Sequence, residues 1–236
     1  MGKSSRIKNR QKPAASGNPK SWFPLIVTVA VVLVIGIFAF AVTSLNNRAV
    51  EPQALPASAQ SSIVAGDGGI RLSDGKTRIE VYLDAMCPFC GQFENNYTEP
   101  ILADEELSLT VRPISILDRL SQGTNYSTRA ATAIYAVAAK SDDAEVTAAY
   151  IAALFADQPE EGSEGYSNEE LFAFASDLGV DIAEADLKPY ETFVQRVVKD
   201  VPIGPDNQTV VTPTILVNGT FTPFTGNVEQ DIASWK

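Results

Sequence analysis

Three patterns of apolar residues divide the chain. Residues 25–42 form an unbroken apolar run, residues 77–84 and 107–115 are rich in β-branched or alternating apolar residues, and residues 117–201 place apolar side chains at three- and four-residue spacings. These patterns are typical of a membrane-spanning helix, of β-strands and of amphipathic helices, respectively. The sequence therefore predicts an α/β fold preceded by one transmembrane helix.

The apolar run and its flanks predict a single-pass anchor. Eighteen helical residues span about 27 Å, and the aromatic residues just before them bring the segment close to the ~30 Å hydrocarbon core. The first 20 residues contain six lysines and arginines and no acid, so the positive-inside rule keeps this end in the cytoplasm. We expect a cytoplasmic basic tail at 1–21, an anchor in the cell membrane at 22–44 and an extracytoplasmic remainder.

Residues 45–73 are rich in Ala, Ser, Gln, Pro and Gly and have no periodic apolar face. Such a composition predicts a flexible stalk. A small-x-small site at Ala57 and Ala59 leaves a cleaved signal peptide as the alternative to the anchor. That site lies well beyond the apolar run, and the chain has no lipobox cysteine, so the anchor is favoured.

Charge and composition exclude several classes of function. Setting aside the six basic residues of the tail leaves 12 basic residues against 29 acidic ones, which argues against a nucleic-acid partner. The chain has no histidine, which excludes a Ser-His-Asp triad, a Cys-His dyad and any His-containing zinc site. Two cysteines cannot complete a structural zinc site, and we predict no metal site.

The order of the predicted elements indicates a small sheet interrupted by helices. The strand at 77–84, a helical stretch reaching at least to Tyr97 and the strand at 107–115 form a βαβ unit with a parallel pair. After the helical block, β character returns around an Asn218–Gly219 hairpin turn, and a short helix closes the chain.

Cys87 and Cys90 are the only cysteines of the chain. A disulfide across so short a loop stabilises the fold by only about 2 kcal/mol before strain, so a purely structural role is a poor explanation. Cys87 follows a strand and opens a helix, where free N–H groups and the helix dipole stabilise a thiolate, and Pro88 suits the first helical position. Cys90, one turn later, can attack a mixed disulfide formed at Cys87. The pair itself carries the two electrons, so we expect no other cofactor.

Two short motifs resemble the signatures of the DsbA-type thiol–disulfide oxidoreductases of the thioredoxin-fold superfamily: VYLDAMCPFCGQFE around the cysteines and VTPTILVNG near the C-terminus. The resemblance implies a thioredoxin-fold domain at 74–116 and 202–236 with a helical insertion at 117–201. It also implies that Cys87 is the nucleophile, and that Pro213 is cis and lies beside the cysteines, where the adjacent backbone pairs with substrate.

The sequence departs from that family at the position of its buried acid, which here is Val81. Glu80 and Asp84 are the nearby candidates for a proton acceptor, and a solvated carboxylate is the alternative for Asp84. Phe89 stands where strong oxidants often have histidine, which predicts a milder oxidant. Thr212, before the expected cis proline, is a candidate donor to the Cys87 thiolate; the alternative is an ordinary strand residue.

Together these features predict a membrane-anchored, extracytoplasmic thiol–disulfide oxidoreductase that acts most simply as an oxidase. Its substrates would be exported thiol-containing or unfolded proteins, and a membrane redox partner would recycle the disulfide. A reductase or isomerase is the first alternative. A peptide-binding or chaperone-like membrane module with a structural disulfide is the alternative from another class.

Overall fold

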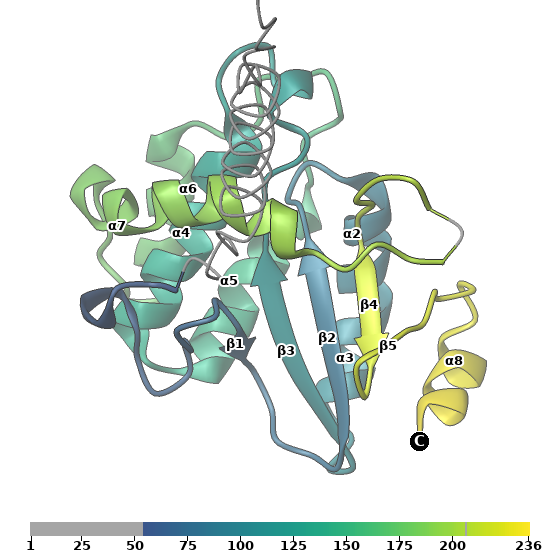
Figure 1. Cartoon of the computed structure of the whole chain (residues 1–236). Coiled ribbons are helices and arrows are strands. Elements are labelled where there is room, and N and C mark those ends of the chain that lie inside the picture. The colour runs from purple at the N-terminus through teal and green to yellow at the C-terminus, as the bar shows by residue number, and fades with distance from the viewer. Residues whose placement is uncertain (1–53, 206) are drawn as a thin grey trace, which may run out of the picture. The chain divides into compact units, whose positions relative to one another are not determined.

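A five-stranded mixed sheet in the order β1-β3-β2-β4-β5 organises the fold (Figure 1). The computed structural model describes residues 54–205 and 207–236. The strands are β1 (Ile70–Arg71), β2 (Thr77–Leu83), β3 (Leu107–Pro113), β4 (Thr214–Val217) and β5 (Thr220–Phe221).

The parallel pair β2 and β3 forms the centre of the sheet, from Thr77 opposite Leu107 to Leu83 opposite Pro113. The connection between them is α2 (Pro88–Phe93), the π-helical turn η2 (Glu94–Thr98) and α3 (Glu99–Leu102). This is the predicted βαβ unit. Because α2 begins directly after β2, the cysteine pair lies at the carboxyl end of a central strand.

The helical block at 117–201 is confirmed. It contains α4 (Tyr126–Ser141), α5 (Ala144–Ala156), α6 (Asn168–Asp177) and α7 (Glu184–Val197), with the short 3-10 turns η3 (Asp118–Leu120) and η4 (Val198–Asp200). Ser167 and Glu170 form the capping box that the sequence indicates at the start of α6. In Figure 1 these four helices are labelled on the left, whereas the β4–β5 edge of the sheet and α8 (Val228–Trp235) lie on the right.

The hairpin between β4 and β5 also follows the sequence. Asn218 and Gly219 have φ values of 50° and 81°, the left-handed conformation that a two-residue turn of this kind requires. The turn returns the chain antiparallel to β4, and β4 itself pairs antiparallel with β2.

The predicted flexible stalk at 45–73 is wrong for its described part. Leu55, Val64 and Ile70 are 2%, 1% and 0% exposed, and Ile70 pairs with Val111 of β3. This segment also contains the 3-10 turn η1 (Ala57–Ala59). Its apolar residues are spaced irregularly because it packs as coil and as a two-residue edge strand, so no helical or strand period reveals its burial.

The predicted basic tail at 1–21 and anchor at 22–44 lie outside the described residues, as does the beginning of the predicted stalk. Within the part that the structure describes, no helix is both long enough and apolar enough to cross a membrane.

Candidate active site

Cys87 occupies the N-cap position of α2, and Pro88 follows at the first helical position, as the sequence predicts. The Cys87 carbonyl oxygen accepts hydrogen bonds from the backbone N–H groups of Cys90 (3.0 Å) and Gly91 (3.1 Å), which closes the first turn. Both cysteines are free thiols. Cys87 is 4% exposed and Cys90 is 0% exposed, so only Cys87 can be reached from solvent.

The surroundings of the two sulfurs separate their acidities. A hydrogen bond from the Cys90 thiol lowers the pKa of Cys87, against the opposing effect of burial, and the backbone N–H groups of Cys90 and Phe89 lower it further. Burial, together with the interaction with Cys87, raises the pKa of Cys90 well above its usual value. Cys87 is therefore the more acidic thiol of the pair, and Cys90 retains its proton more strongly.

The segment before β4 completes the site. The Thr212–Pro213 peptide bond is cis, as the resemblance implies. The Cys87 thiol donates to the Thr212 carbonyl oxygen at 3.3 Å, which places this backbone against the nucleophile. The Thr212 hydroxyl lies 2.9 Å from the Cys90 sulfur. It therefore contacts the second cysteine, and the prediction that it donates to the Cys87 thiolate is wrong.

A groove of about 620 Å³ opens beside Cys87. Phe89 lines it and is 60% exposed, a high value for a large apolar side chain. The other walls come from residues after β3 and from the segment leading to Pro213: Ile116, Leu117, Arg119, Glu161, Thr209, Val210, Val211 and Thr212. An extended peptide placed here would meet the Cys87 sulfur, the more exposed sulfur of the pair, next to the exposed ring of Phe89.

This fold has counterparts among known proteins. Residues 70–231 match the family model described as Thioredoxin. The chain belongs to the thioredoxin family. Within it, the free Cys87 and Cys90 thiols lie beside the cis Thr212–Pro213 bond, and the protein is an oxidoreductase.

Solved structures share this thioredoxin-family fold. Reduced DsbA from Mycobacterium tuberculosis aligns with a TM-score of 0.55 and 22% identity, covering 71% of this chain and 99% of that one. Reduced DsbG from the same organism aligns with a TM-score of 0.59 and 23% identity, covering 73% and 88%. Oxidised BdbD from Bacillus subtilis aligns with a TM-score of 0.55 and 21% identity, covering 75% and 95%.

A curated relative is the serine/threonine-protein kinase PknE of Mycobacterium tuberculosis, 33% identical over 111 residues. The match covers 44% of this chain and 19% of the kinase. The chain thus matches about a fifth of that relative's length, so the similarity concerns one segment of the kinase.

Asp84 directly follows β2, next to the cysteine pair, and is fully buried. The alternative of a solvated carboxylate is therefore wrong. Its carboxylate accepts hydrogen bonds from the backbone N–H groups of Met86 (2.9 Å), Ile116 (2.8 Å) and Leu117 (3.0 Å). Its own N–H donates to the Cys90 sulfur at 3.4 Å. Burial raises the pKa of Asp84, which makes it an acid able to exchange a proton beside the cysteines.

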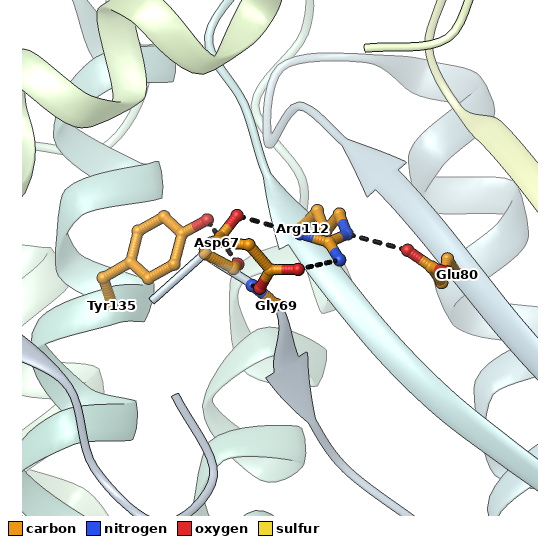
Figure 2. A network of polar contacts seen from close by, with 6 residues as sticks. Asp67, Gly69, Glu80, Arg112 and Tyr135 are labelled. Atoms are coloured by element: carbon orange, nitrogen blue, oxygen red, sulfur yellow. Dashed lines mark hydrogen bonds and ion pairs between the residues drawn. The ribbon is translucent and has the colours of Figure 1, made fainter. Parts of the chain in front are cut away.

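Glu80 is engaged elsewhere. Its carboxylate accepts from Arg112 Nε at 2.9 Å, and the same guanidinium binds the Asp67 carboxylate at 2.8 Å (Figure 2). The Tyr135 hydroxyl donates to the neighbouring Gly68 carbonyl oxygen at 2.9 Å. The structure therefore assigns Glu80 to an ion-pair network on the sheet and not to proton transfer at the cysteines, and that prediction is wrong.

Two residues close to α2 were not predicted, and the first of them, Glu94, lines a different hollow from Cys87. Glu94 is 5% exposed, accepts a hydrogen bond from the Thr98 hydroxyl at 2.8 Å, and has its pKa raised by burial to about 7. Its place four residues after Cys90, on the same side of a helix, was the sequence signal that could have identified it.

Gln158, in the helical insertion, donates hydrogen bonds to the backbone of the cysteine loop. A single glutamine in a loop gives no sequence signal at all.

Proposed function

We propose that this thioredoxin-family oxidoreductase is an extracytoplasmic oxidase for exported, thiol-containing proteins. The observation that carries the proposal is the asymmetry of the pair: a stabilised thiolate at Cys87 and a buried, protonated thiol at Cys90. Stabilising the thiolate favours the reduced pair over the disulfide, and such a pair tends to take electrons from its substrates.

The reaction proceeds by two thiol–disulfide exchanges. A substrate thiolate attacks the Cys87 sulfur of the Cys87–Cys90 disulfide, the S–S bond breaks, and Cys90 leaves and takes up a proton. A second substrate thiolate then attacks the substrate sulfur of the mixed disulfide and releases the Cys87 thiolate. The substrate is oxidised by two electrons and the pair is reduced by two.

Asp84 is suited to proton exchange with Cys90 during this cycle, because its backbone touches that sulfur and its buried carboxyl has a raised pKa. We further propose that residues 22–44 anchor the enzyme in the cell membrane and that a membrane redox partner reoxidises the pair. The Phe89 side chain supplies neither charge nor a hydrogen bond to Cys87, which favours a mild oxidant.

Trapping variants test the assignment of the cysteines. Cys90→Ser is expected to accumulate mixed disulfides between Cys87 and exported proteins, whereas Cys87→Ser is expected to abolish exchange. Accumulation by Cys87→Ser instead would reverse the roles of the cysteines.

A glutathione redox titration of the wild-type protein tests the direction. A potential between about −230 and −120 mV, with net oxidation of a reduced unfolded protein, supports an oxidase. A potential at or below about −270 mV indicates a reductase. Client binding that persists without both cysteines, and no exchange by wild type, would indicate a chaperone-like module.

A further inference from the structure

Gln158 joins the helical insertion to the cysteine loop. It follows the end of α5, and its Nε2 donates to the carbonyl oxygens of Ala85 and Cys87, both at 2.9 Å. Its Oε1 lies over Gly91: a Cβ atom at that position would be 2.3 Å from this oxygen. One amide thus holds the chain on both sides of Met86 and covers the first turn of α2.

This arrangement bears on the nucleophile through the Cys87 carbonyl. That oxygen accepts from Gln158 as well as from the backbone N–H groups of Cys90 and Gly91. The turn that begins α2 is therefore fixed by the Gln158 side chain, which comes from outside the cysteine loop. With this turn fixed, the N–H groups of Phe89 and Cys90 remain directed at the Cys87 sulfur and lower the pKa of Cys87.

The chemistry of the amide adds to this effect. The NH₂ group is the positive end of the amide dipole, and it lies against the backbone that carries the nucleophilic cysteine. A positive end on the backbone of the cysteine itself favours the thiolate over the thiol. The sequence also leaves room for the Gln158 amide. Glycine at position 91 has no side-chain atom that would collide with Gln158 Oε1.

We propose that Gln158 is a positioning residue that stabilises the Cys87 thiolate and thereby raises the reduction potential of the pair. The inference rests on the redox role of the pair but not on the direction of electron flow in the cell. It gives the insertion a part in the chemistry: a segment about 70 residues from the cysteines in sequence sets how oxidising they are.

Two substitutions remove the contact in different ways. Gln158→Met keeps an unbranched side chain of similar length but has no N–H donor. Gly91→Ala leaves Gln158 in the sequence but displaces its flexible end, and alanine suits a helix better than glycine does. Gln60→Met is the matched control, since Gln60 Nε2 also donates to a backbone carbonyl, that of Leu55 at 2.6 Å, in the N-terminal segment.

Thiolate absorbance against pH and a glutathione redox titration measure the effect. We expect Gln158→Met and Gly91→Ala each to raise the Cys87 pKa by about half a unit, about threefold in the ionisation constant. The potential should fall in parallel by about 15 mV, at about 30 mV per tenfold change. The double variant should shift no further than Gln158→Met alone, because both changes remove one contact. Gln60→Met should shift neither quantity.

A purely structural glutamine would lower the melting temperature and leave the Cys87 pKa and the potential unchanged, and that result would overturn the proposal. Additive shifts in the double variant would also contradict it, because Gly91 would then act without Gln158. A wild-type potential typical of a reductase would refute the proposed oxidase but not this inference, which concerns the difference between variant and wild type.

Discussion

Two acids four residues apart, Glu80 in β2 and Asp84 just after it, have opposite surroundings. Glu80 and Asp67 share the guanidinium of Arg112 on the sheet (Figure 2). Burial acts to raise the pKa of Asp67, but the hydrogen bond and charge of Arg112 and the Gly69 N–H together outweigh burial and lower that pKa. Asp84 is buried and accepts hydrogen bonds from three backbone N–H groups, with no cation among its hydrogen-bond partners, and burial raises its pKa. A neighbouring guanidinium favours the ionised form of an acid, whereas a buried acid without a cation beside it can gain a proton more easily.

The largest expected effect comes from Asp84→Ala. The change leaves three backbone N–H groups of the active-site loops without their acceptor, and each unpaired buried donor costs about 1–3 kcal/mol. We expect the free energy of unfolding, measured in urea, to fall by about 3 kcal/mol or more.

Asp84→Asn separates the charge from the hydrogen bonds. It keeps one acceptor oxygen, so the loss of stability should be smaller than for alanine. The Asp84 charge raises the pKa of Cys87, so its removal should lower that pKa. An unchanged Cys87 pKa in Asp84→Asn would show that this carboxyl is structural, like Glu80.

Arg112→Met tests the other side of the comparison. The side chain is 13% exposed, whereas its partners Asp67 and Glu80 are 61% and 26% exposed, so the pairs lie between surface and buried cases. We expect a loss of about 2 kcal/mol, smaller in 1 M salt because salt screens exposed charges. The Cys87 pKa and the rate of disulfide exchange should not change; a change in either would join this network to the redox site.

The sequence predicts the order of elements well and the contacts of single side chains poorly. The strand, cysteine pair and helix, the capping box of Ser167 and the Asn218–Gly219 turn are local patterns, and each is confirmed. Glu80 and Asp84 are both acids near the end of one strand. Their roles differ because Arg112, 32 residues from Glu80 in sequence, pairs with Glu80, and the local sequence does not show this.

The remaining errors share that cause. The Thr212 hydroxyl lies by Cys90 and not by Cys87 because of the way β4 pairs with β2, which no spacing encodes. The apolar residues after position 54 lack a period and therefore predict part of a stalk, although Ile70 pairs with β3 at the edge of the sheet. Burial of this kind depends on partners that are distant in sequence.

Glu94 offers a pH-dependent test, because it is a buried acid that accepts one hydroxyl hydrogen bond. Its pKa rises from an ordinary 4.5 to about 7 on folding, so its protonated form favours the fold. Stability from this group is present below about pH 4.5 and is lost as the pH rises through about 7. We expect Glu94→Gln to remove this dependence and to be more stable than wild type at pH 8 by up to about 3 kcal/mol.

Urea unfolding between pH 4 and pH 8 measures the difference, with Glu99→Gln on the adjoining helix as an exposed control. The Thr98 hydroxyl can still donate to the glutamine oxygen, so hydrogen bonding is retained. Parallel pH profiles for wild type and Glu94→Gln would show that this carboxyl does not titrate in the fold.

The smallest effect is expected for Glu80→Gln, and it decides the comparison most directly. The amide oxygen can still accept from Arg112 Nε, so only the charge is lost from a pair that is partly exposed. Such pairs contribute about 0.5 kcal/mol, and the loss should disappear in high salt. The Cys87 pKa, the potential and the rate of exchange should equal those of wild type, since Glu80 is held by a guanidinium that does not contact the cysteine loop. If Glu80→Gln slowed exchange or moved the Cys87 pKa as Asp84→Asn does, the two acids would act together, and the separation between the sheet network and the redox site would be wrong.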